Sequence, residues 1–412
     1  MRALVYGVAR PAGCIEPEPR DPHEQYLASQ PFGLHDIPEP TLRHGWILTR
    51  PLLAGICGSD SKVMLGDLSE GDIDNPMAAF SSLPYVPGHE VVAEVLELAP
   101  GASGVEPGQR VVLNPWLSCL PRGVSPLCPA CRSGDLSLCH SFASGDIGPG
   151  VHIGVTADAP GGFAELMAAH CSMLIPVPDS IPAELAVLAD PFSVSLHAVT
   201  RHPPPDAGTV IVYGAGALGL TTVAALRALY PTTRVAVVAR FAAQKAMALG
   251  LGAETVFEPE PADALVEQLA AWSGSTLRQA FAGLPMAHPG AVDVVYDTVA
   301  KPGTLEVGIR LLASRGTLVV TGVHTPGRYE WTPIYFKELR VVGSNAFGME
   351  TVEGVRQHAL NHYLDLVTAG RVDLSGLLTH RFALSDWWPA MLALSDQATG
   401  GAIKVAFDPT LT

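Results

Sequence analysis

The sequence has little positive charge and few aromatic residues. Lys and Arg total 25 against 40 Asp and Glu in 412 residues, a net charge of −15, and aromatic residues make up 7%. No block of consecutive basic residues interrupts this acidic character. Such a surface repels phosphate backbones and anionic lipid headgroups. The composition therefore argues against nucleic-acid and membrane partners and favours a small-molecule partner.

Long apolar runs are missing as well. The N-terminus, MRALVYGVARPAG, lacks the extended apolar core and the cleavage site of a secretory signal, so we expect a cytoplasmic protein. The stretch 207–226 is uncharged but contains four glycines. Its strand-like first half and helix-like second half predict a buried strand followed by a helix rather than a membrane span.

Cysteine is scarce, and four of the seven cysteines fall within 21 residues. In a reducing compartment such clustering predicts a metal site rather than disulfides. Cys128, Cys131 and Cys139 have the spacing C-x2-C-x7-C, and Cys119 lies upstream of them. Four thiolates close a tetrahedral shell with no open position, which is typical of structural zinc. We place this lobe at about 115–145.

The chain is long enough for two domains. Up to residue 185, short β-type runs alternate with Pro/Gly turns, which predicts a small all-β barrel. Over 186–348, apolar strands alternate with helices, which predicts a parallel sheet covered on both faces. The remainder, 349–412, is expected to begin with a helix over 352–370 and to end in short β segments.

Three stretches are expected to be insertions. The first two are interpreted as loops in the β region, and the third as an extension of the second domain. They cover 10–40, 64–84 and 270–290.

A dinucleotide site is predicted where Gly214, Gly216 and Gly219 follow the strand TVIVY and open a helix. In G-x-G-x-x-G, the first glycine permits the tight turn, the second lets the backbone approach a pyrophosphate, and the third allows close helix packing. The next strand ends in Ala239 and Arg240 rather than in an acidic residue. Arg240 either accepts a 2′-phosphate, which favours NADP(H) over NAD(H), or is a solvated residue that starts the next helix.

A second metal site is suggested by GICGSD, which contains Cys57, and by PGHEVVAEV, which contains His89 and Glu90. A thiolate, an imidazole and a carboxylate form a mixed shell that leaves room for water or substrate, as catalytic zinc requires. Each piece alone is a weak signal, since a lone histidine is more often a satisfied turn residue.

Together the segments GICGSD, PGHEVVAEV, PGQRVVLNP, CPACRSGDLSLC, LADPFSVSLHAV, VIVYGAGALGL and GAIKV resemble the zinc-dependent medium-chain alcohol dehydrogenase family, particularly its sorbitol and threonine dehydrogenase-like branch. The resemblance implies an α/β plus β fold. A GroES-like β-barrel catalytic domain (1–185) is completed by the C-terminal segment (349–412), and a Rossmann doubly wound parallel sheet (186–348) is inserted between them.

The resemblance also implies residue roles. Ser59 takes the position of the family's proton-relay hydroxyl. Asp60 takes the position of the carboxylate that orients the ligand histidine. Lys62 stands where many relatives have a histidine that carries the proton onward to solvent. The catalytic zinc ligands would be Cys57, His89, Glu90 and Asp190, and the structural ligands Cys119, Cys128, Cys131 and Cys139, with Ser125 at the usual first position. The cofactor-binding residues would be Gly214, Ala215, Gly216, Ala217, Leu218, Gly219, Ala239, Arg240, Thr298, Val299, Gly322, Val323, Asn345 and Phe347.

The implied activity is reversible hydride transfer between an alcohol or polyol and a nicotinamide cofactor, with two zinc ions per chain, in a homodimer or homotetramer. Two other interpretations remain. One is a zinc-free quinone or enoyl reductase of the same fold, which the three catalytic ligands argue against. The other is a non-catalytic nucleotide-binding redox sensor that keeps only structural zinc.

Overall fold

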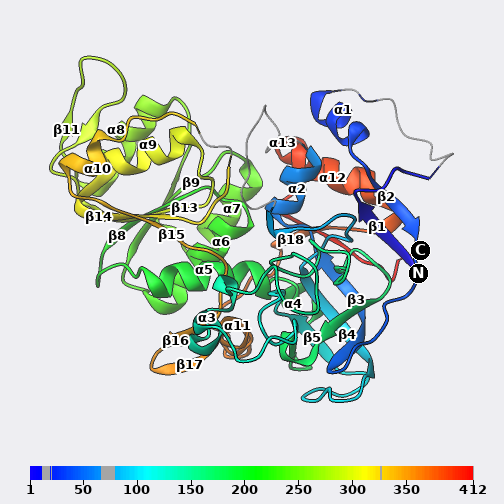
Figure 1. Cartoon of the computed structure of the whole chain (residues 1–412). Coiled ribbons are helices and arrows are strands. Elements are labelled where there is room, and N and C mark those ends of the chain that lie inside the picture. The colour runs from blue at the N-terminus through cyan, green and yellow to red at the C-terminus, as the bar shows by residue number, and fades with distance from the viewer. Residues whose placement is uncertain (12–18, 20, 66–78, 325–326, 412) are drawn as a thin grey trace.

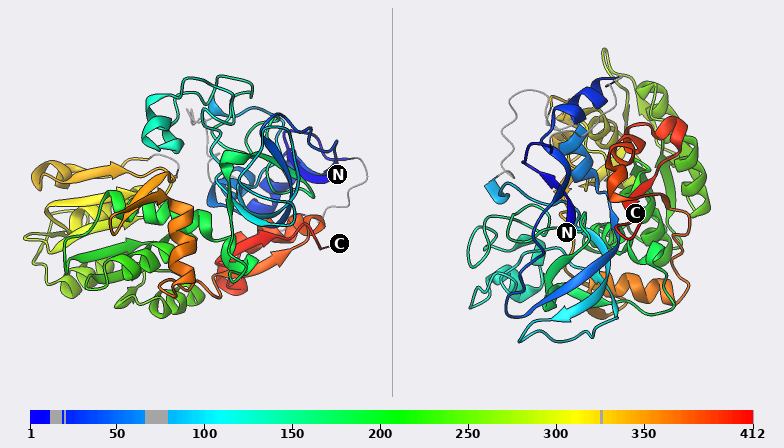
Figure 2. Two further views of the ribbon diagram at one scale, coloured as in Figure 1. Left: turned by 90° about the horizontal axis from the view of Figure 1, so that it is seen from below. Right: turned by 90° about the vertical axis from the view of Figure 1, so that its right-hand side faces the viewer.

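The structure is a computed structural model that describes residues 1–11, 19, 21–65, 79–324 and 327–411 (Figure 1). Parts of the expected insertions at 10–40 and 64–84 lie outside these residues. The described part forms two sheet-based regions that lie side by side (Figures 1 and 2).

The first region is built around a seven-stranded sheet with the order β18-β19-β3-β4-β5-β7, and β6 also pairs with β3. Its core strands are rich in β-branched residues, and the side chains of Val92 and Val95 on β4 are buried. Strand β19 pairs antiparallel with β3, so that segments far apart in the sequence contribute to one sheet. The strands are β3 (Trp46–Gly55), β4 (Glu90–Leu98), β5 (Arg110–Leu113), β6 (Met167–His170), β7 (Leu174–Pro176), β18 (Leu378–Phe382) and β19 (Lys404–Phe407).

The N-terminal insertion is more ordered than the predicted loop. Its described part contains helix α1 (Pro22–Ser29) and strand β2 (Phe32–Asp36), which pairs with β1 (Arg2–Tyr6). The sequence carried the helix signal, because Asp21 caps the helix by accepting a hydrogen bond from the backbone N–H of Glu24, and proline opens the first turn. The expectation of a loop was therefore wrong for these residues.

The second region is a six-stranded parallel sheet with the order β10-β9-β8-β13-β14-β15. The order reverses next to β8, where α/β sheets bind ligands beyond the strand ends. With the first region, this sheet confirms the predicted fold class. The strands are β8 (Thr209–Tyr213), β9 (Arg234–Val238), β10 (Thr255–Phe257), β13 (Val292–Asp297), β14 (Leu312–Val320) and β15 (Arg340–Gly343). The associated helices are α5 (Ala189–Arg201), α6 (Ala217–Leu229), α7 (Ala242–Gly250), α8 (Ala262–Ser273), α9 (Pro302–Leu311) and α10 (Thr332–Phe336).

The helix expected over 352–370 is half wrong. Residues Met349–Val352 (β16) and Val355–His358 (β17) form an antiparallel hairpin, and the helix α11 covers only Ala359–Thr368. The turn consists of Glu353 and Gly354, both with positive φ (50° and 83°), as a two-residue hairpin turn requires. Sequence periodicity did not separate these short strands from the following helix.

The smaller elements complete the chain. The segment 270–290, expected to extend the nucleotide-binding region, contains the end of α8 and the hairpin of β11 and β12. These elements are α2 (Gly58–Leu65), α3 (Pro129–Ser133), η2 (Leu136–Leu138), η3 (Cys171–Met173), α4 (Ala183–Ala186), β11 (Leu277–Arg278), β12 (Met286–Ala287), η4 (Leu384–Asp386), α12 (Trp387–Ser395) and α13 (Gln397–Gly400).

One hydrophobic core runs from the first sheet to the second. It joins Val92 of β4 to Phe192 of α5, Val210 of β8 and Tyr363 of α11. Because α5 and α11 carry the chain between the two sheets, their shared packing fixes the sheets relative to each other (Figure 2). Among the described residues, no helix is both long and apolar enough to span a bilayer.

Candidate active site and metal centres

The fold brings Cys57, His89 and Glu90 together. Each offers one ligand atom, and these atoms lie within 4.8 Å of one another. Cys57 follows β3, whereas Glu90 begins β4 and pairs with Gly55 across the two strands. Antiparallel pairing of β3 with β4 therefore closes the 32-residue gap between the cysteine and the histidine.

The three side chains fit a bound metal ion. They supply sulfur, nitrogen and oxygen donors, which zinc accepts. His89 and Glu90 are buried. Within the part of the chain that the structure describes, Nδ1 of His89 has no hydrogen-bond partner, and Asp60 Oδ1 lies 4.0 Å from it. Asp60 also accepts a hydrogen bond from the backbone N–H of Cys57 at 3.0 Å. The carboxylate thus contacts the cysteine backbone and faces the imidazole.

Asp190 lies near this group but is not one of the three converging side chains. It is buried in the first turn of α5. Burial, together with the charge of Glu90, raises its pKa to about 7. Ser59 lies beside Asp60 in the first turn of α2 and is exposed.

Sequence reasoning missed Lys404, although GAIKV was among the segments that carried the resemblance. Its side chain is buried, contacts the carboxylate of Glu90, and donates to the carbonyl oxygen of Ile56 at 2.9 Å. Burial lowers the pKa of Lys404, but the negative charges of Glu90 and Cys57 raise it by a larger amount. The net pKa is therefore above its ordinary value. A charged ammonium group is therefore part of the site.

Two aromatic neighbours were also missed. The ring of His152 packs on that of His89 with centroids 4.5 Å apart, and Trp116 meets His152 edge-on at 5.7 Å. Nδ1 of His152 lies 2.6 Å from the carbonyl oxygen of Ile153. Burial, with the charge of His89, lowers the pKa of His152 to about 3, so this imidazole is neutral. An isolated histidine in a loop gives no sequence signal for such packing.

The four clustered cysteines also converge. The ligand atoms of Cys119, Cys128, Cys131 and Cys139 lie within 4.8 Å of one another, so their donor set fits a closed zinc shell. Burial raises the pKa of Cys128, but hydrogen bonds from the backbone N–H groups of His140 and Cys131 lower it to about 6.

The loop after Cys119 is organised by Arg122, whose side chain is fully buried. It donates five hydrogen bonds to the carbonyl oxygens of Leu117, Ser144, Ile147, Gly148 and Gly150. These hydrogen bonds hold the loop after Cys119 against the segment 144–150. The loop is thereby held in the conformation in which Cys119 lies next to the other three cysteines. Ser125 has no thiol to offer, and the four cysteines form the group without it.

The glycine turn has the geometry that a dinucleotide site requires. Gly214 has a φ of +98°, and a Cβ on Gly219 would lie 2.0 Å from the carbonyl oxygen of Gly214. A Cβ on Gly216 would meet none of the described residues within 4 Å, and among these residues the N-terminus of α6 is open to a ligand here. The residues fit the pyrophosphate of a nucleotide. Ala215, Ala217 and Leu218 belong to the same turn and first helical residues.

The other predicted cofactor residues divide into two groups. Thr298 and Val299 lie against the glycine turn, because a Cβ on Gly214 would contact the side chains of both. Gly322 is next to them, because a Cβ on Gly322 would contact the backbone of Thr298 and Val299. Val323 is exposed. Ala239 is buried at the end of β9.

Two further predicted residues lie toward the cysteine lobe. The Asn345 side chain donates to the carbonyl oxygen of Ser137 at 3.4 Å. Phe347 is buried between the rings of Trp116 and His358, at 6.3 and 5.7 Å. Arg240 is exposed and lies 3.7 Å from Glu260.

Comparison with protein families agrees with this geometry. A model described as alcohol dehydrogenase GroES-like domain matches residues 43–179, and one described as zinc-binding dehydrogenase matches residues 217–361. The chain belongs to the zinc-dependent medium-chain alcohol dehydrogenase family.

Individual relatives cover nearly the whole chain of this family member. A sorbitol dehydrogenase of Bacillus subtilis (strain 168) is 24% identical, over 87% of this chain and 89% of its own. A (R,R)-butanediol dehydrogenase of Saccharomyces cerevisiae is 28% identical, over 86% of this chain and 89% of its own. A similar crystal structure is described as a zinc-binding dehydrogenase from Sinorhizobium meliloti 1021 bound to NADP. Its sequence is 26% identical, its TM-score is 0.70, and the match covers 92% of this chain and 96% of that chain. The chain is therefore a zinc-dependent oxidoreductase that uses a nicotinamide cofactor.

Proposed function

We propose that this dehydrogenase oxidises an alcohol or polyol, and reduces the corresponding aldehyde or ketone, at the site formed by Cys57, His89 and Glu90. The observation that carries the proposal is the convergence of these three ligand atoms within 4.8 Å, in a buried place that also holds Asp60 and Lys404. Similarity to sorbitol and butanediol dehydrogenases supports a substrate of this class.

Zinc, when bound, polarises the substrate oxygen and makes its proton easier to remove, and the nicotinamide exchanges the hydride. The chain holds and orients these groups. Cys57, His89 and Glu90 would bind the metal, and Asp60 would orient His89 through its Nδ1. The hydroxyl of Ser59, exposed beside Asp60, would take the proton from the substrate hydroxyl. Asp190 is proposed as a further ligand that would approach the metal from α5.

Lys404 is proposed to set the charge of the site. A thiolate and a carboxylate buried together repel each other and lose hydration. The ammonium group contacts Glu90, which compensates one of these charges. Glu90 is thereby held between a cation of the chain and the proposed metal ion.

A second zinc ion is proposed for the lobe of Cys119, Cys128, Cys131 and Cys139. Four thiolates leave no position for a substrate, so this ion would be structural. Support comes from the hydrogen bonds that the thiols accept, such as Cys128 N–H to Cys119 Sγ at 3.4 Å.

NADP(H) is proposed as the preferred cofactor. Arg240 lies two residues after the end of β9, where an acidic residue would otherwise hold the ribose 2′-hydroxyl, and a guanidinium binds phosphate bidentately. The NADP in the similar Sinorhizobium protein agrees with this preference.

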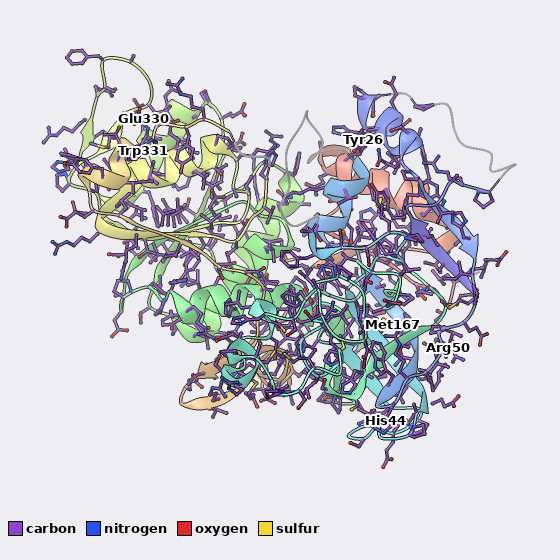
Figure 3. All side chains as sticks on the ribbon, in the orientation of Figure 1. Tyr26, His44, Arg50, Met167, Glu330 and Trp331 are labelled. Carbon is purple, nitrogen blue, oxygen red and sulfur yellow. The ribbon has the colours of Figure 1, made fainter. Side chains whose placement is uncertain are left out.

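A homo-oligomer is proposed, assembled through the open edge of the nucleotide-binding sheet. Strand β15 lies at this edge, and Val341 on it is 41% exposed. Trp331, Tyr335 and Phe336, on or next to α10, are also exposed. Figure 3 shows Trp331 in the region of the nucleotide-binding sheet, away from the region that contains β3 and β4. An edge strand beside an apolar patch offers a second copy both hydrogen bonds and buried area.

Metal content and one substitution test the function. We expect two zinc ions per purified chain and alcohol-dependent reduction of the cofactor, monitored by absorbance. Cys57→Ser should remove one zinc and lower kcat/KM at least about a hundredfold, because a catalytic ligand is lost. Cys171→Ser is the matched control, since Cys171 lies in neither cysteine group. One zinc ion per chain in the wild type would favour the redox sensor, and full turnover by Cys57→Ser would favour the zinc-free reductase.

A further inference from the structure

The end of strand β9 carries an ion pair that bears on cofactor choice. Arg240 Nη2 lies 3.7 Å from Glu260 Oε1. The two residues come from different segments that the sheet brings together, because Ala239 N–H donates to the carbonyl oxygen of Phe257 at the end of β10. Glu260 follows in the loop that leads to α8.

This pair lies beside the glycine turn. Gly214 N–H donates to the carbonyl oxygen of Val238 at 3.0 Å, so the turn and the end of β9 are adjacent. Tyr213, just before the turn, is close enough to respond to both charges. Burial and the charges of Asp297 and Glu260 raise its pKa, Arg240 lowers it, and the net pKa is about 12.

The loop after β10 places a second carboxylate against a cation. Glu258 forms an ion pair with Lys245 on α7. Each of these two cations near the end of β9 is thus matched by an acidic side chain of the same loop. A 2′-phosphate bound to Arg240 would carry between one and two negative charges and would meet Glu260 at the same guanidinium.

We infer that Glu260 competes with the cofactor's 2′-phosphate for Arg240 and so sets how strongly the protein discriminates between NADP(H) and NAD(H). This inference rests on the proposed function, because it requires a nucleotide at the glycine turn. Both Glu260 and the phosphate are anions that the guanidinium attracts, and a carboxylate beside Arg240 repels the phosphate and offsets part of the positive charge that would bind it. NAD(H) lacks the phosphate and does not enter this competition.

The test measures cofactor binding without substrate, by isothermal titration of the purified holoenzyme with NADP+ and with NAD+. Glu260→Gln removes the competing charge and keeps the side-chain shape. We expect the Kd for NADP+ to fall about three- to tenfold and the Kd for NAD+ to change less than about twofold. The gain should shrink as the salt concentration rises, because the groups are exposed. Glu258→Gln is the matched control, and it should leave the ratio of the two Kd values unchanged.

A double variant tests whether Glu260 acts through Arg240. Arg240→Ala should weaken NADP+ binding, and in that background Glu260→Gln should improve it by less than about twofold. An unchanged Kd ratio in Glu260→Gln would overturn the inference, as would an undiminished gain in the Arg240→Ala background. If the wild type binds neither cofactor, the proposed function fails together with the inference. If it binds both and Glu260→Gln has no effect, only the inference fails.

Discussion

At the scale of single residues, the glycines of the nucleotide turn meet different surroundings. A Cβ on Gly219 would lie 2.0 Å from the backbone oxygen of Gly214, whereas one on Gly216 would meet nothing within 4 Å. The same substitution therefore tests two different requirements, internal packing at Gly219 and access for a ligand at Gly216.

We expect Gly219→Ala to lower the free energy of unfolding by about 2 kcal/mol or more, because the backbone cannot move away from the added methyl group without separating α6 from β8. Gly216→Ala should lower the free energy of unfolding by less than about 1 kcal/mol, since alanine is only a poorer N-cap for α6, but it should weaken cofactor binding at least about tenfold. Chemical unfolding and titration with NADP+ measure the two effects. Equal effects of the two substitutions on either measurement would contradict this assignment.

Glu350 is a buried carboxylate that connects the hairpin of β16 and β17 to α5. It accepts hydrogen bonds from Thr200 at 2.9 Å and Arg201 at 3.3 Å, and it pairs with His197 at 2.5 Å. Burial raises its pKa, but these partners lower it to a net value below 4.5. The charged form is therefore stabilised by folding.

Glu350→Gln should lower the free energy of unfolding at pH 7 by about 2 kcal/mol, because a buried charged acceptor is lost. Since the folded-state pKa is depressed, the stabilisation is present above pH 4.5 and is lost as the pH falls through the folded-state pKa. The difference between wild type and variant should thus shrink in acid, as measured by denaturant unfolding at several pH values. Glu353→Gln, on the same hairpin but in an exposed pair with Arg371, is the control and should have no measurable effect. A difference that grows in acid would refute the argument.

The site could be predicted from sequence where chemistry leaves a residue-type signature. Cys57, His89 and Glu90 are metal-ligand types within short motifs, and they converge as predicted. Lys404 and His152 could not be found in this way. The lysine is separated from Glu90 by more than three hundred residues, and the histidine acts by ring packing, for which many residue types would serve.

At the scale of elements, the cysteine lobe is built from loops with short helical turns, and its order depends on Arg122 and the four thiols together. From sequence, Ser125 stands where relatives have the first cysteine, and Cys119 could replace that ligand only if the segment PRGVSP loops back. The hydrogen-bonded guanidinium of Arg122 holds the loop that follows Cys119 in place. No local sequence pattern predicts this role of the arginine.

We expect Cys119→Ser to reduce the zinc content by one ion per chain and to lower the Tm by several degrees, because the closed shell loses a ligand. Ser125→Ala should change neither quantity, since a serine supplies no thiolate and the four cysteines already complete the tetrahedral set. Metal analysis and a thermal scan provide the readouts. Retention of both zinc ions by Cys119→Ser would show that another residue supplies the fourth ligand.

The second correction at this scale concerns β16 and β17. A helix was predicted over 352–370, but only its second half, Ala359–Thr368, is helical. The first half contains Glu353 and Gly354, whose positive φ values make a two-residue turn. Turn chemistry therefore outweighed periodicity over a stretch too short for periodicity to decide.

At the scale of the whole molecule, the proposed association through β15 predicts a dimer or tetramer in light scattering after size exclusion. Val341→Glu should shift the mass toward the monomer, because the buried partner strand would face an unpaired charge. Val355→Glu is the control, as Val355 is an exposed valine of the distant hairpin. A wild type that elutes as a monomer, or equal effects of both variants, would rule out this interface.

The order of elements and the two sheets followed from sequence, because strand composition and helix spacing are local properties. The joining of the two ends of the chain is not local. Strand β3 lies between β4 and the C-terminal strand β19, and Arg10 reaches the rings of Trp387 and Trp388 at 5.2 and 5.9 Å. Such contacts depend on chain segments separated by an entire sheet.

This arrangement has a consequence during synthesis. The ribosome synthesises β3 before, and β19 after, all strands of the nucleotide-binding sheet, so that sheet can be finished while the other sheet still has an open side. Until then Glu90 has no ammonium group beside it. A nascent chain that stops before Lys404 would have a formed nucleotide turn but a Glu90 carboxylate without its compensating charge. We expect proteases to degrade such a chain, so that truncation would lower the amount of protein rather than the turnover of each molecule.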